Sequence, residues 1–370
     1  MIAGGGTAGH TVPAIAIGRA LVARGHGPDS IHFVGSRRGV EARLVPDAGF
    51  AITLLPGRGI QRSLSPANLG AAFGLSVAGA RALWLVARRR PRVVVSLGGY
   101  AGLPAALAAV VLRRPLVLAE SNAVPGAANR VVSRFAASAA VAFEGTDLAR
   151  AVVTGNPVRT EILTVERSAE ARAEARRALG LPGARAVVAV FGGSLGSRRI
   201  NDAVRGLVER WGARSDVAVR HVVGRRDWPA HAAVPTDGHP GGDGADDGLV
   251  YQAVEYEDRM ELVYAAADVA VCRAGGSSCA ELTVVGLPAV LVPLPGAPGD
   301  HQTANAQALA RAGAAVVIAD AELDADRLAA ELDALLADPE ARRAMAERSA
   351  ALGRPDAADR VAALVEASAG

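Results

Sequence analysis

Short apolar runs alternate with helical patterns along the first part of the chain. Runs at 30–35, 93–97 and 115–120 predict strands that end in glycine or polar residues. A helical pattern covers 13–24, with Pro13 in its first turn and Gly25 just past its end, and another begins near Leu103. An irregular, arginine-bearing stretch separates the first two strands. Strands that alternate with helices predict a doubly wound α/β domain.

The same alternation begins again after residue 160. A charged helix at 169–181 precedes a buried strand at 186–191, a glycine turn and a helix at 200–211. Further strands are expected at 217–224, within 267–276 and at 288–294, with a helix from Ser277. We therefore expect an α/β protein with two Rossmann-like domains, 1–159 and 160–344, facing each other across a cleft. An amphipathic helix within 345–370 is expected to pack back on the first domain.

The run at 93–112 carries no charge and has the length of a membrane-spanning helix. It is interrupted at Gly98 and Gly99 and again at Pro104. Because these residues break a continuous helix, the run is better interpreted as a strand, a glycine turn and a helix.

Composition narrows the chemistry. All 40 basic residues are arginine, so a P-loop lysine, a Schiff base and a lysine general base are excluded. A net charge of +3 on 370 residues does not indicate a nucleic-acid binder. Cys272 and Cys279 lack metal-site spacing, and Asp324 and Asp326 are expected to favour a helix N-terminus. We therefore predict no metal, no cofactor and no nucleic-acid partner for a reduced cytosolic protein.

Two glycine turns in the second half are candidates for phosphate binding. Gly192-Gly193-Ser194-x-Gly196 follows a buried strand and opens a helix, and Gly275-Gly276-Ser277-Ser278 repeats the arrangement. Two helix N-termini directed at one crevice suit a diphosphate, although each could be a structural turn. Glu281 could accept hydrogen bonds from a ribose or complement the helix dipole, and Gln302 and Asn305 could bind a ligand or cap a helix.

The first half has its own candidates at strand ends. Gly4-x-Gly6-x-x-Gly9 has the form of a dinucleotide-binding loop, and His10 follows it directly. A helix N-terminus keeps an imidazole neutral, as a general base requires, but a local capping role is the alternative. Tyr100, and Glu120 with Asn122, follow two further strands. Polar clusters at neighbouring strand ends indicate a ligand crevice.

Taken in order, these motifs resemble the MurG family of N-acetylglucosaminyltransferases, which complete the lipid-linked precursor of peptidoglycan. The resemblance rests on GGTAGH (5–10), SLGGY (96–100), ESNAVPGAANR (120–130), TGNPVRTEI (154–162), FGGSLGSRRIN (191–201), CRAGGSSCAE (272–281) and DHQTANA (300–306). Ala8, Ala119, Ser121 and Leu195 depart from the usual residues, and Glu257 replaces an apolar residue near the base.

The resemblance implies the fold called GT-B and a metal-independent, inverting reaction. N-acetylglucosamine would pass from UDP-N-acetylglucosamine to the C4 hydroxyl of undecaprenyl-pyrophosphoryl-MurNAc-pentapeptide, with His10 as the base. The residues that it assigns to UDP-N-acetylglucosamine are Thr7, Ala8, Gly9, Asn122, Arg159, Ser194, Gly276, Ser277, Ser278, Cys279, Ala280, Glu281 and Gln302. Those that it assigns to the acceptor are Gly5, Gly6, Gly98, Gly99, Tyr100 and Glu120. An enzyme of this kind is a peripheral protein on the cytoplasmic face of the cell membrane.

Residues 73–92 could supply the membrane contact. They set Leu75, Leu83, Trp84, Leu85 and Val86 beside Arg81, Arg88, Arg89, Arg90 and Arg92. A basic amphipathic segment suits an anionic membrane surface, and an ordinary packed helix is the alternative.

Two other enzyme classes share part of this pattern. Arg37 and Arg38 after the strand at 30–35 could hold the 2′-phosphate of NADP in a dehydrogenase. A nucleotide-sugar epimerase or another small-molecule glycosyltransferase would also have two domains. The second glycine loop and Glu281 favour the enzymes that bind a sugar nucleotide over the dehydrogenase.

Overall fold

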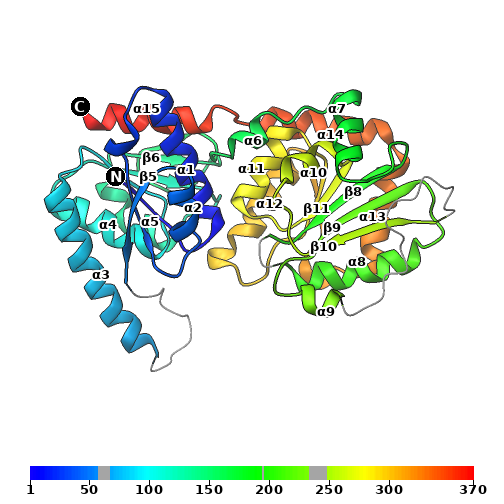
Figure 1. Ribbon diagram of the computed structural model, residues 1–370, viewed down its shortest axis with the longest axis horizontal. Helices are drawn as coiled ribbons and strands as arrows, with labels where there is room; N and C mark the ends of the chain where they lie inside the picture. The colour runs from blue at the N-terminus through cyan, green and yellow to red at the C-terminus, as the bar shows by residue number, and fades with distance from the viewer. Residues whose placement is uncertain (57–66, 194–195, 233–247) are drawn as a thin grey trace. The chain divides into compact units, whose positions relative to one another are not determined.

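The computed structural model describes residues 1–370 apart from 57–66, 194–195 and 233–247. The chain forms two compact units (Figure 1). The N-terminal unit comprises Met1–Arg159 and Arg354–Gly370, and the C-terminal unit comprises Thr160–Gly353.

The N-terminal unit is built on a seven-stranded parallel sheet with the order β3-β2-β1-β4-β5-β6-β7. Its short central strand pairs on both sides, with Ile2 opposite Phe33 and opposite Val95. The strands are β1 (Ile2–Ala3), β2 (His32–Ser36), β3 (Ala51–Leu55), β4 (Val94–Ser96), β5 (Leu116–Glu120), β6 (Ser138–Val141) and β7 (Ala151–Val153).

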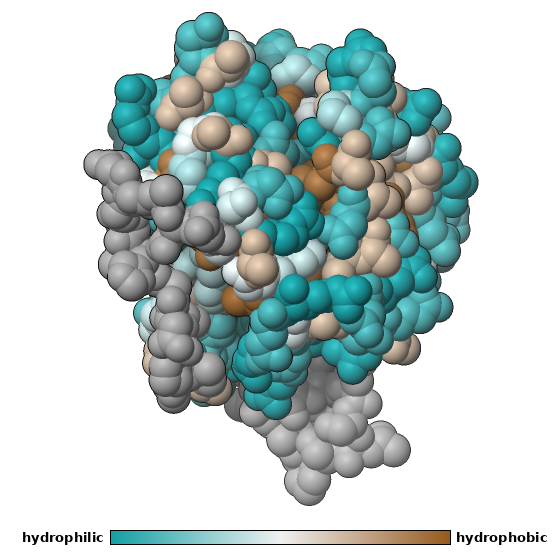
Figure 2. Space-filling model, turned by 90° about the vertical axis from the view of Figure 1, so that its right-hand side faces the viewer, coloured by the Kyte–Doolittle hydropathy of each residue, from teal (hydrophilic) through white to brown (hydrophobic). Residues whose placement is uncertain are grey.

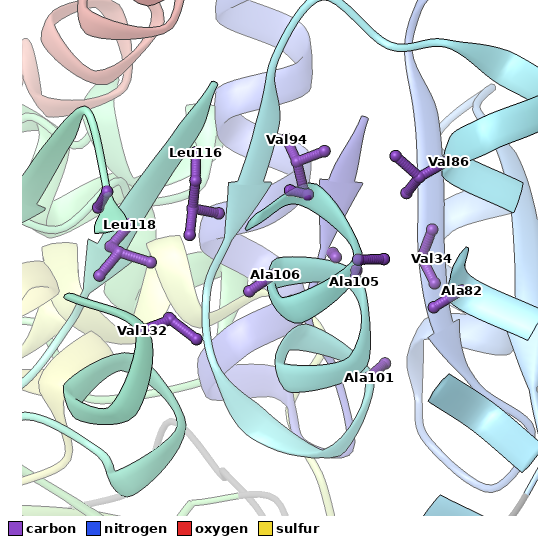
Figure 3. Packing of buried hydrophobic residues seen from close by; sticks show 14 of the residues in the cluster. Val34, Ala82, Val86, Val94, Ala101, Ala105, Ala106, Leu116, Leu118 and Val132 are labelled. Carbon is purple, nitrogen blue, oxygen red and sulfur yellow. The ribbon is translucent and has the colours of Figure 1, made fainter. Parts of the chain in front are cut away.

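Helices cover both faces of this sheet because neighbouring strand residues point to opposite sides. Val34 joins the cluster that contains α3, α4 and α5, whereas Phe33 joins the cluster that contains α1, α2 and α15. In Figure 3, Ala82 and Val86 of α3 lie near Val34 and Ala105. The helices are α1 (Ala8–Ala23), α2 (Glu41–Asp47), α3 (Ala67–Arg89), α4 (Gly99–Val111), α5 (Ala127–Val132) and α15 (Ala357–Ala369).

The C-terminal unit has a six-stranded parallel sheet with the order β10-β9-β8-β11-β12-β13. Aliphatic residues of α8 and α13 pack together on one of its faces, around Ile200, Leu207 and Leu328. The strands are β8 (Ala186–Phe191), β9 (Val217–Val222), β10 (Val250–Val254), β11 (Val269–Cys272), β12 (Ala289–Leu291) and β13 (Ala315–Val317).

The helices of the C-terminal unit precede, connect and follow these strands. They are α6 (Thr160–Leu163), α7 (Ala169–Ala178), α8 (Arg198–Arg210), α9 (Trp228–Ala232), α10 (Met260–Ala266), α11 (Gly276–Val285), α12 (His301–Arg311), α13 (Ala325–Ala337) and α14 (Pro339–Leu352). Asp324 caps α13 by accepting a hydrogen bond from the Arg327 amide (2.8 Å), so its expected capping role is confirmed.

Four predictions of element bounds are wrong. The stretch between β2 and β4 is not irregular, because it contains α2, β3 and α3. The first helix starts at Ala8 rather than Pro13, so Pro13 lies inside it. The helix expected near Leu103 starts at Gly99. The return helix does not occupy all of 345–370: α14 ends at Leu352 within the C-terminal unit, and an extended Gly353 separates it from α15.

Residues 93–112 form β4, a glycine turn and α4, as predicted. Among the residues that the structure describes, no helix is long and apolar enough to cross a membrane.

Candidate active site

The candidate loops lie where the direction of winding changes in each sheet. In the N-terminal unit, β1 lies between β2 and β4, and in the C-terminal unit β8 lies between β9 and β11. Loops that leave the carboxyl ends of such paired central strands diverge and open a crevice, which is where doubly wound domains bind ligands. Most of the residues proposed from the sequence lie in the turns after β1, β4, β8 and β11 or at the starts of the helices that follow these turns.

The first glycine loop is a sharp turn between β1 and α1. Gly5 and Gly6 have φ angles of 150° and 100°, which disfavour residues with side chains. A Cβ atom on Gly99 would lie 2.5 Å from the Gly5 carbonyl oxygen, so the loops after β1 and β4 are in close contact. Because α1 begins at Ala8, the predicted ligand residues Ala8 and Gly9 lie in its first turn rather than in the loop.

His10 lies in the same first turn of α1. Its Nδ1 atom is 3.3 Å from Oγ1 of Thr7, the residue that caps the helix. The Thr7 carbonyl oxygen accepts hydrogen bonds from the amides of His10 and Thr11, which fixes the start of the helix. The Thr7 hydroxyl therefore contributes to the orientation of the imidazole.

Glu41, a buried residue at the start of α2, is not among the residues predicted from the sequence. Its Oε2 atom accepts a hydrogen bond from the Gly6 amide (2.9 Å), so this predicted acceptor contact is occupied from within the unit. The only local signal is that glycines surround the residue in sequence, at positions 35 and 39.

The second loop of the N-terminal unit is held by side chains. The Ser96 hydroxyl accepts from the Gly98 amide (3.3 Å). The Tyr100 hydroxyl lies within hydrogen-bond distance of two carbonyl oxygens, those of Pro56 (2.7 Å) and Gly74 (3.2 Å), and burial raises its pKa. Tyr100 thus connects the residue that follows β3 to the backbone of α3.

Glu120 organises the turn that follows β5. Its carboxylate accepts hydrogen bonds from the backbone and side-chain amides of Asn122, from the Gly126 amide and from Asn129 Nδ2, at 2.9–3.1 Å. These four hydrogen bonds to one carboxylate fix the conformation of the turn and the position of Asn122 within it.

Glu281 in α11 is a buried acid with a directional partner. Its side chain is 8% exposed, and its Oε2 atom accepts a hydrogen bond from the hydroxyl of Tyr264 (2.7 Å), which packs edge-on against Phe191. At the start of the same helix, the buried Ser277 Oγ has no hydrogen-bond partner among the described residues. Cys279 faces the core, where burial raises its thiol pKa to about 12, so it could meet a ligand only through its backbone.

Two amide side chains of α12 fix neighbouring loops. Gln302 Oε1 accepts from the Leu294 amide (2.9 Å), and Asn305 Nδ2 donates to the Ala274 carbonyl oxygen (3.0 Å), immediately before the cap of α11. Asn305 is therefore a buried brace of the second glycine turn.

The glycine loop after β8 is described except for Ser194 and Leu195, which lie outside the described residues. The Gly196 amide donates to the Gly193 carbonyl oxygen (2.9 Å), and a Cβ atom on Gly196 would overlap the carbonyl oxygen of Val223. Asn201 of α8 donates to that same oxygen (3.1 Å). Arg159, also assigned to the donor, is the last residue of the first segment of the N-terminal unit.

Glu257 is a structural acid in this unit. It forms a buried ion pair with Arg220 (2.6 Å) and accepts from the Arg259 amide (3.0 Å). Burial alone would raise its pKa, but these hydrogen bonds hold the pKa below its usual value. Among the described residues there is no group of three histidine, cysteine or acidic side chains that could hold a metal ion.

Comparison with protein families defines the class. The glycosyltransferase family 28 N-terminal domain matches residues 1–141, and the family 28 C-terminal domain matches residues 187–361. Two doubly wound domains with these matches have the architecture of GT-B glycosyltransferases.

Individual relatives narrow the class further. A protein of Acidothermus cellulolyticus is 43% identical over 100% of this chain and 97% of its own length, and one of Desulforudis audaxviator is 39% identical over 100% and 98%. Both are named UDP-N-acetylglucosamine--N-acetylmuramyl-(pentapeptide) pyrophosphoryl-undecaprenol N-acetylglucosamine transferase. The chain belongs to this family, the MurG family.

Solved structures agree with the fold. The crystal structure of Acinetobacter baumannii MurG aligns with a TM-score of 0.72 and 28% identity, covering 99% of this chain and 98% of that one. A putative UDP-N-acetylglucosamine 2-epimerase of Listeria monocytogenes aligns with a TM-score of 0.65 at 16% identity, covering 96% and 92%. The second similarity concerns the fold alone.

Proposed function

We propose that the protein transfers N-acetylglucosamine from UDP-N-acetylglucosamine to N-acetylmuramyl-(pentapeptide) pyrophosphoryl-undecaprenol. The observation that carries the proposal is full-length membership of a family whose relatives bear this name. In the reaction, the acceptor C4 hydroxyl attacks the anomeric carbon and loses its proton, while the bond from that carbon to the diphosphate breaks. UDP leaves, and the configuration at the anomeric carbon inverts.

The donor would bind mainly to the C-terminal unit. Glu281, which accepts a hydrogen bond from Tyr264, would accept from ribose hydroxyls, and Ser277 offers a buried hydroxyl that lacks a partner among the described residues. The N-terminal turn of α11 (276–281) would contact the nucleotide, and Gln302 the sugar. Ser194 and Arg159 would contact the diphosphate.

The acceptor would bind to the N-terminal unit. The loops after β1 and β4 would face its pyrophosphate with Gly5, Gly98, Gly99 and Tyr100. His10, oriented by Thr7 (3.3 Å), would remove the proton from the attacking hydroxyl, and Asn122, held by Glu120 (3.1 Å), would line the reaction centre. Helix N-termini and Arg159 would stabilise the departing UDP, which is the role that a metal has in other transferases.

The decisive experiment is a transfer assay with the full chain. Radiolabelled UDP-N-acetylglucosamine is incubated alone, with the lipid-linked acceptor, or with the acceptor sugar lacking pyrophosphate and lipid. Label should move only to the lipid-linked acceptor. Conversion of the donor alone to an epimer would support the epimerase alternative, and saturable NADPH binding would support a dehydrogenase; either result without transfer would contradict the proposal.

We also propose peripheral attachment to the cytoplasmic face of an anionic membrane through α3 and α4. On α3, Trp84 is 62% exposed and carries the Arg88 guanidinium 5.6 Å from its ring centre. Leu107 and Val111 of the adjacent α4 are also exposed. An apolar surface edged by arginines suits lipid headgroups, at about 1 kcal/mol for each basic residue near the surface.

The prediction for residues 73–92 requires one correction. Leu85 and Val86 are buried in the core of the unit and cannot contact lipid. Arg92 is exposed, but its side chain donates a hydrogen bond to the carbonyl oxygen of Gly370 (2.6 Å). The face of the molecule shown in Figure 2 is mostly hydrophilic, and its apolar residues lie in small recessed patches.

Vesicle flotation tests this attachment. Wild-type protein should float with vesicles that contain phosphatidylglycerol, and less so as salt rises. Trp84→Ser should reduce flotation, whereas Leu352→Ser, at an exposed leucine of the C-terminal unit, should not. No flotation at low salt, or equal loss in both variants, would contradict the proposal.

A further inference from the structure

Glu41 is a carboxylate enclosed beneath the first glycine loop. The residue is 1% exposed, although it stands at the first position of α2. Its Oε1 atom accepts from the amide (2.7 Å) and the hydroxyl (2.8 Å) of Ser36, at the end of β2. Its Oε2 atom accepts from the Gly6 amide (2.9 Å). The carboxylate thus joins the carboxyl end of β2 to the loop that follows β1.

The surrounding backbone leaves space for this one side chain. A Cβ atom built on Gly5, Gly35 or Gly39 would overlap atoms of Glu41. Three glycines, one in the loop after β1, one in β2 and one in the turn that follows β2, therefore shape a slot that the side chain fills. On the other side of the loop, a Cβ atom on Gly99 would lie 2.5 Å from the Gly5 carbonyl oxygen. Gly5 is confined between Glu41 and the loop after β4.

A carboxylate taken out of water is costly unless its oxygens receive hydrogen bonds. Here all three contacts are donated to the carboxylate, and one of the donors belongs to a loop with two glycines at positive φ. The bond to Gly6 therefore selects one conformation of a segment that glycine would otherwise leave free to move. It also fixes the start of α1, because Thr7 and Ala8 follow Gly6 directly.

We propose that Glu41 is a positioning residue for acceptor binding, and this inference rests on the proposed function. Glu41 acts on the acceptor only through the loop. Because its carboxylate takes the Gly6 amide, the acceptor pyrophosphate would be met by the first N–H groups of α1, which have no acceptor within the helix. Without Glu41 the loop samples other conformations, and the acceptor must then bind and order it in the same step.

Steady-state kinetics of the full chain test the inference. Glu41→Gln keeps the shape of the side chain. Its single amide oxygen can accept either from Ser36 or from the Gly6 amide, but not from both. Its acceptor KM should rise about tenfold, in line with the effect of small displacements of positioning groups, while the donor KM stays unchanged. Gly39→Ala, at a residue without positive φ, should displace the carboxylate and raise the acceptor KM in the same way.

Two matched variants serve as controls. Ser36→Ala removes one donor to Glu41 but leaves the bond to Gly6, so the acceptor KM should hardly change. Gly27→Ala adds a methyl group where no atom lies within 4 Å. Hydrogen exchange of a peptide covering residues 4–10 supplies a readout that needs no turnover, and exchange should be faster in Glu41→Gln than in wild type.

The outcomes separate the two proposals. An unchanged acceptor KM, an equal rise in both KM values, or a loss of thermal stability alone would overturn the positioning role of Glu41. Unchanged hydrogen exchange at the loop in Glu41→Gln, or in Gly39→Ala if the first variant fails to fold, would overturn it as well. Absence of transfer by wild-type protein would contradict the proposed function, and exchange would still decide whether Glu41 holds the loop.

Discussion

The two units use the same strand–glycine turn–helix element in different ways. In the N-terminal unit, the acids near the candidate site are occupied by their own unit: Glu41 holds the Gly6 amide, and Glu120 receives four N–H donors. In the C-terminal unit, the Glu281 carboxylate accepts a hydrogen bond from the Tyr264 hydroxyl (2.7 Å), and Ser277 Oγ is buried without a partner among the described residues. The N-terminal acids organise loops, whereas we propose that Glu281 and Ser277 of the C-terminal unit contact the donor directly.

This contrast separates the kinetic effects of mutations. A residue that shapes a loop changes the binding of whatever the loop contacts, and a residue that touches a ligand changes the affinity for that ligand alone. Catalysis should therefore depend on the N-terminal unit and donor affinity on the C-terminal unit, and the loss of stability in acid should be measurable in each unit.

The largest effect is expected at His10. His10→Ala should lower kcat by roughly 10²–10⁴-fold, the usual contribution of a general base, and leave the donor dissociation constant unchanged. Single-turnover rates and donor titrations measure the two quantities. His26→Ala is the matched control, because His26 is an exposed histidine of the same unit that pairs with Glu366 (2.8 Å). A near-normal kcat at saturating acceptor would remove His10 from the role of base.

Next in size is the effect at Glu281. Glu281→Ala should raise the donor KM roughly 10- to 100-fold, since a hydrogen bond to a charged group contributes about 1.5–3 kcal/mol. Tyr264→Phe, which removes only the hydroxyl that orients Glu281, should raise it less. The acceptor KM should stay constant in both variants. If acceptor and donor KM rise together, the assignment of the donor to this residue is wrong.

Acid should destabilise both units through buried histidines. Burial lowers the pKa of His221 to about 3, with a smaller effect of His231, and burial followed by Arg89 lowers that of His32 to about 4. Both stay neutral in the folded protein, while the unfolded chain takes up protons below its pKa of about 6.5. The stabilising effect is complete above that pH and decreases as pH falls, by about 1.4 kcal/mol per pH unit for each histidine.

Urea unfolding at neutral and mildly acidic pH measures this loss. Because His32 lies in the N-terminal unit and His221 in the C-terminal unit, hydrogen exchange can follow each unit separately. The loss should continue to lower pH in the C-terminal unit. Stability that does not depend on pH between about 6 and 4 would contradict the neutral state of these histidines.

The smallest effect is expected from metal removal. If helix N-termini and Arg159 stabilise the leaving diphosphate, turnover in excess chelator should equal turnover without it. Loss of activity that a divalent ion restores would assign this role to a metal.

The sequence pattern predicted the local parts of this fold well. The strand at 186–191 has the predicted bounds because six apolar residues in a row are typical of a strand buried on both faces. The start of α1 was missed because Pro13 was placed in the first turn, whereas Thr7 in extended conformation ends the loop and the helix starts at Ala8, five residues before Pro13. A packed helix was one of the two interpretations of residues 73–92, but the start of α3 at Ala67 was not predicted because small residues obscure its period.

The site was only partly predictable, for a related reason. The glycine turns are visible as short motifs, but the partners of their neighbours are distant in sequence. Glu41 and Gly6 are 35 residues apart, and Asn305 and Ala274 are 31 apart. Resemblance to a family named Glu120 and Gln302 as ligand residues, and the structure adds that both brace loops. Such dual roles depend on three-dimensional contacts that no local pattern contains.

The position of α15 has a consequence for the synthesis of the protein. Val361, Ala362 and Val365 of this helix complete the hydrophobic core around α1, and Arg24 of the N-terminal unit pairs with Asp359 (2.7 Å) and Glu366 (2.8 Å). The ribosome makes residues 160–356 between the two parts of this core. At about 5–20 residues per second, roughly 10–40 s pass before the last helix is available. The half of the molecule that is made first is therefore the half that finishes folding last, and its apolar face along α1 is open to chaperones throughout that interval.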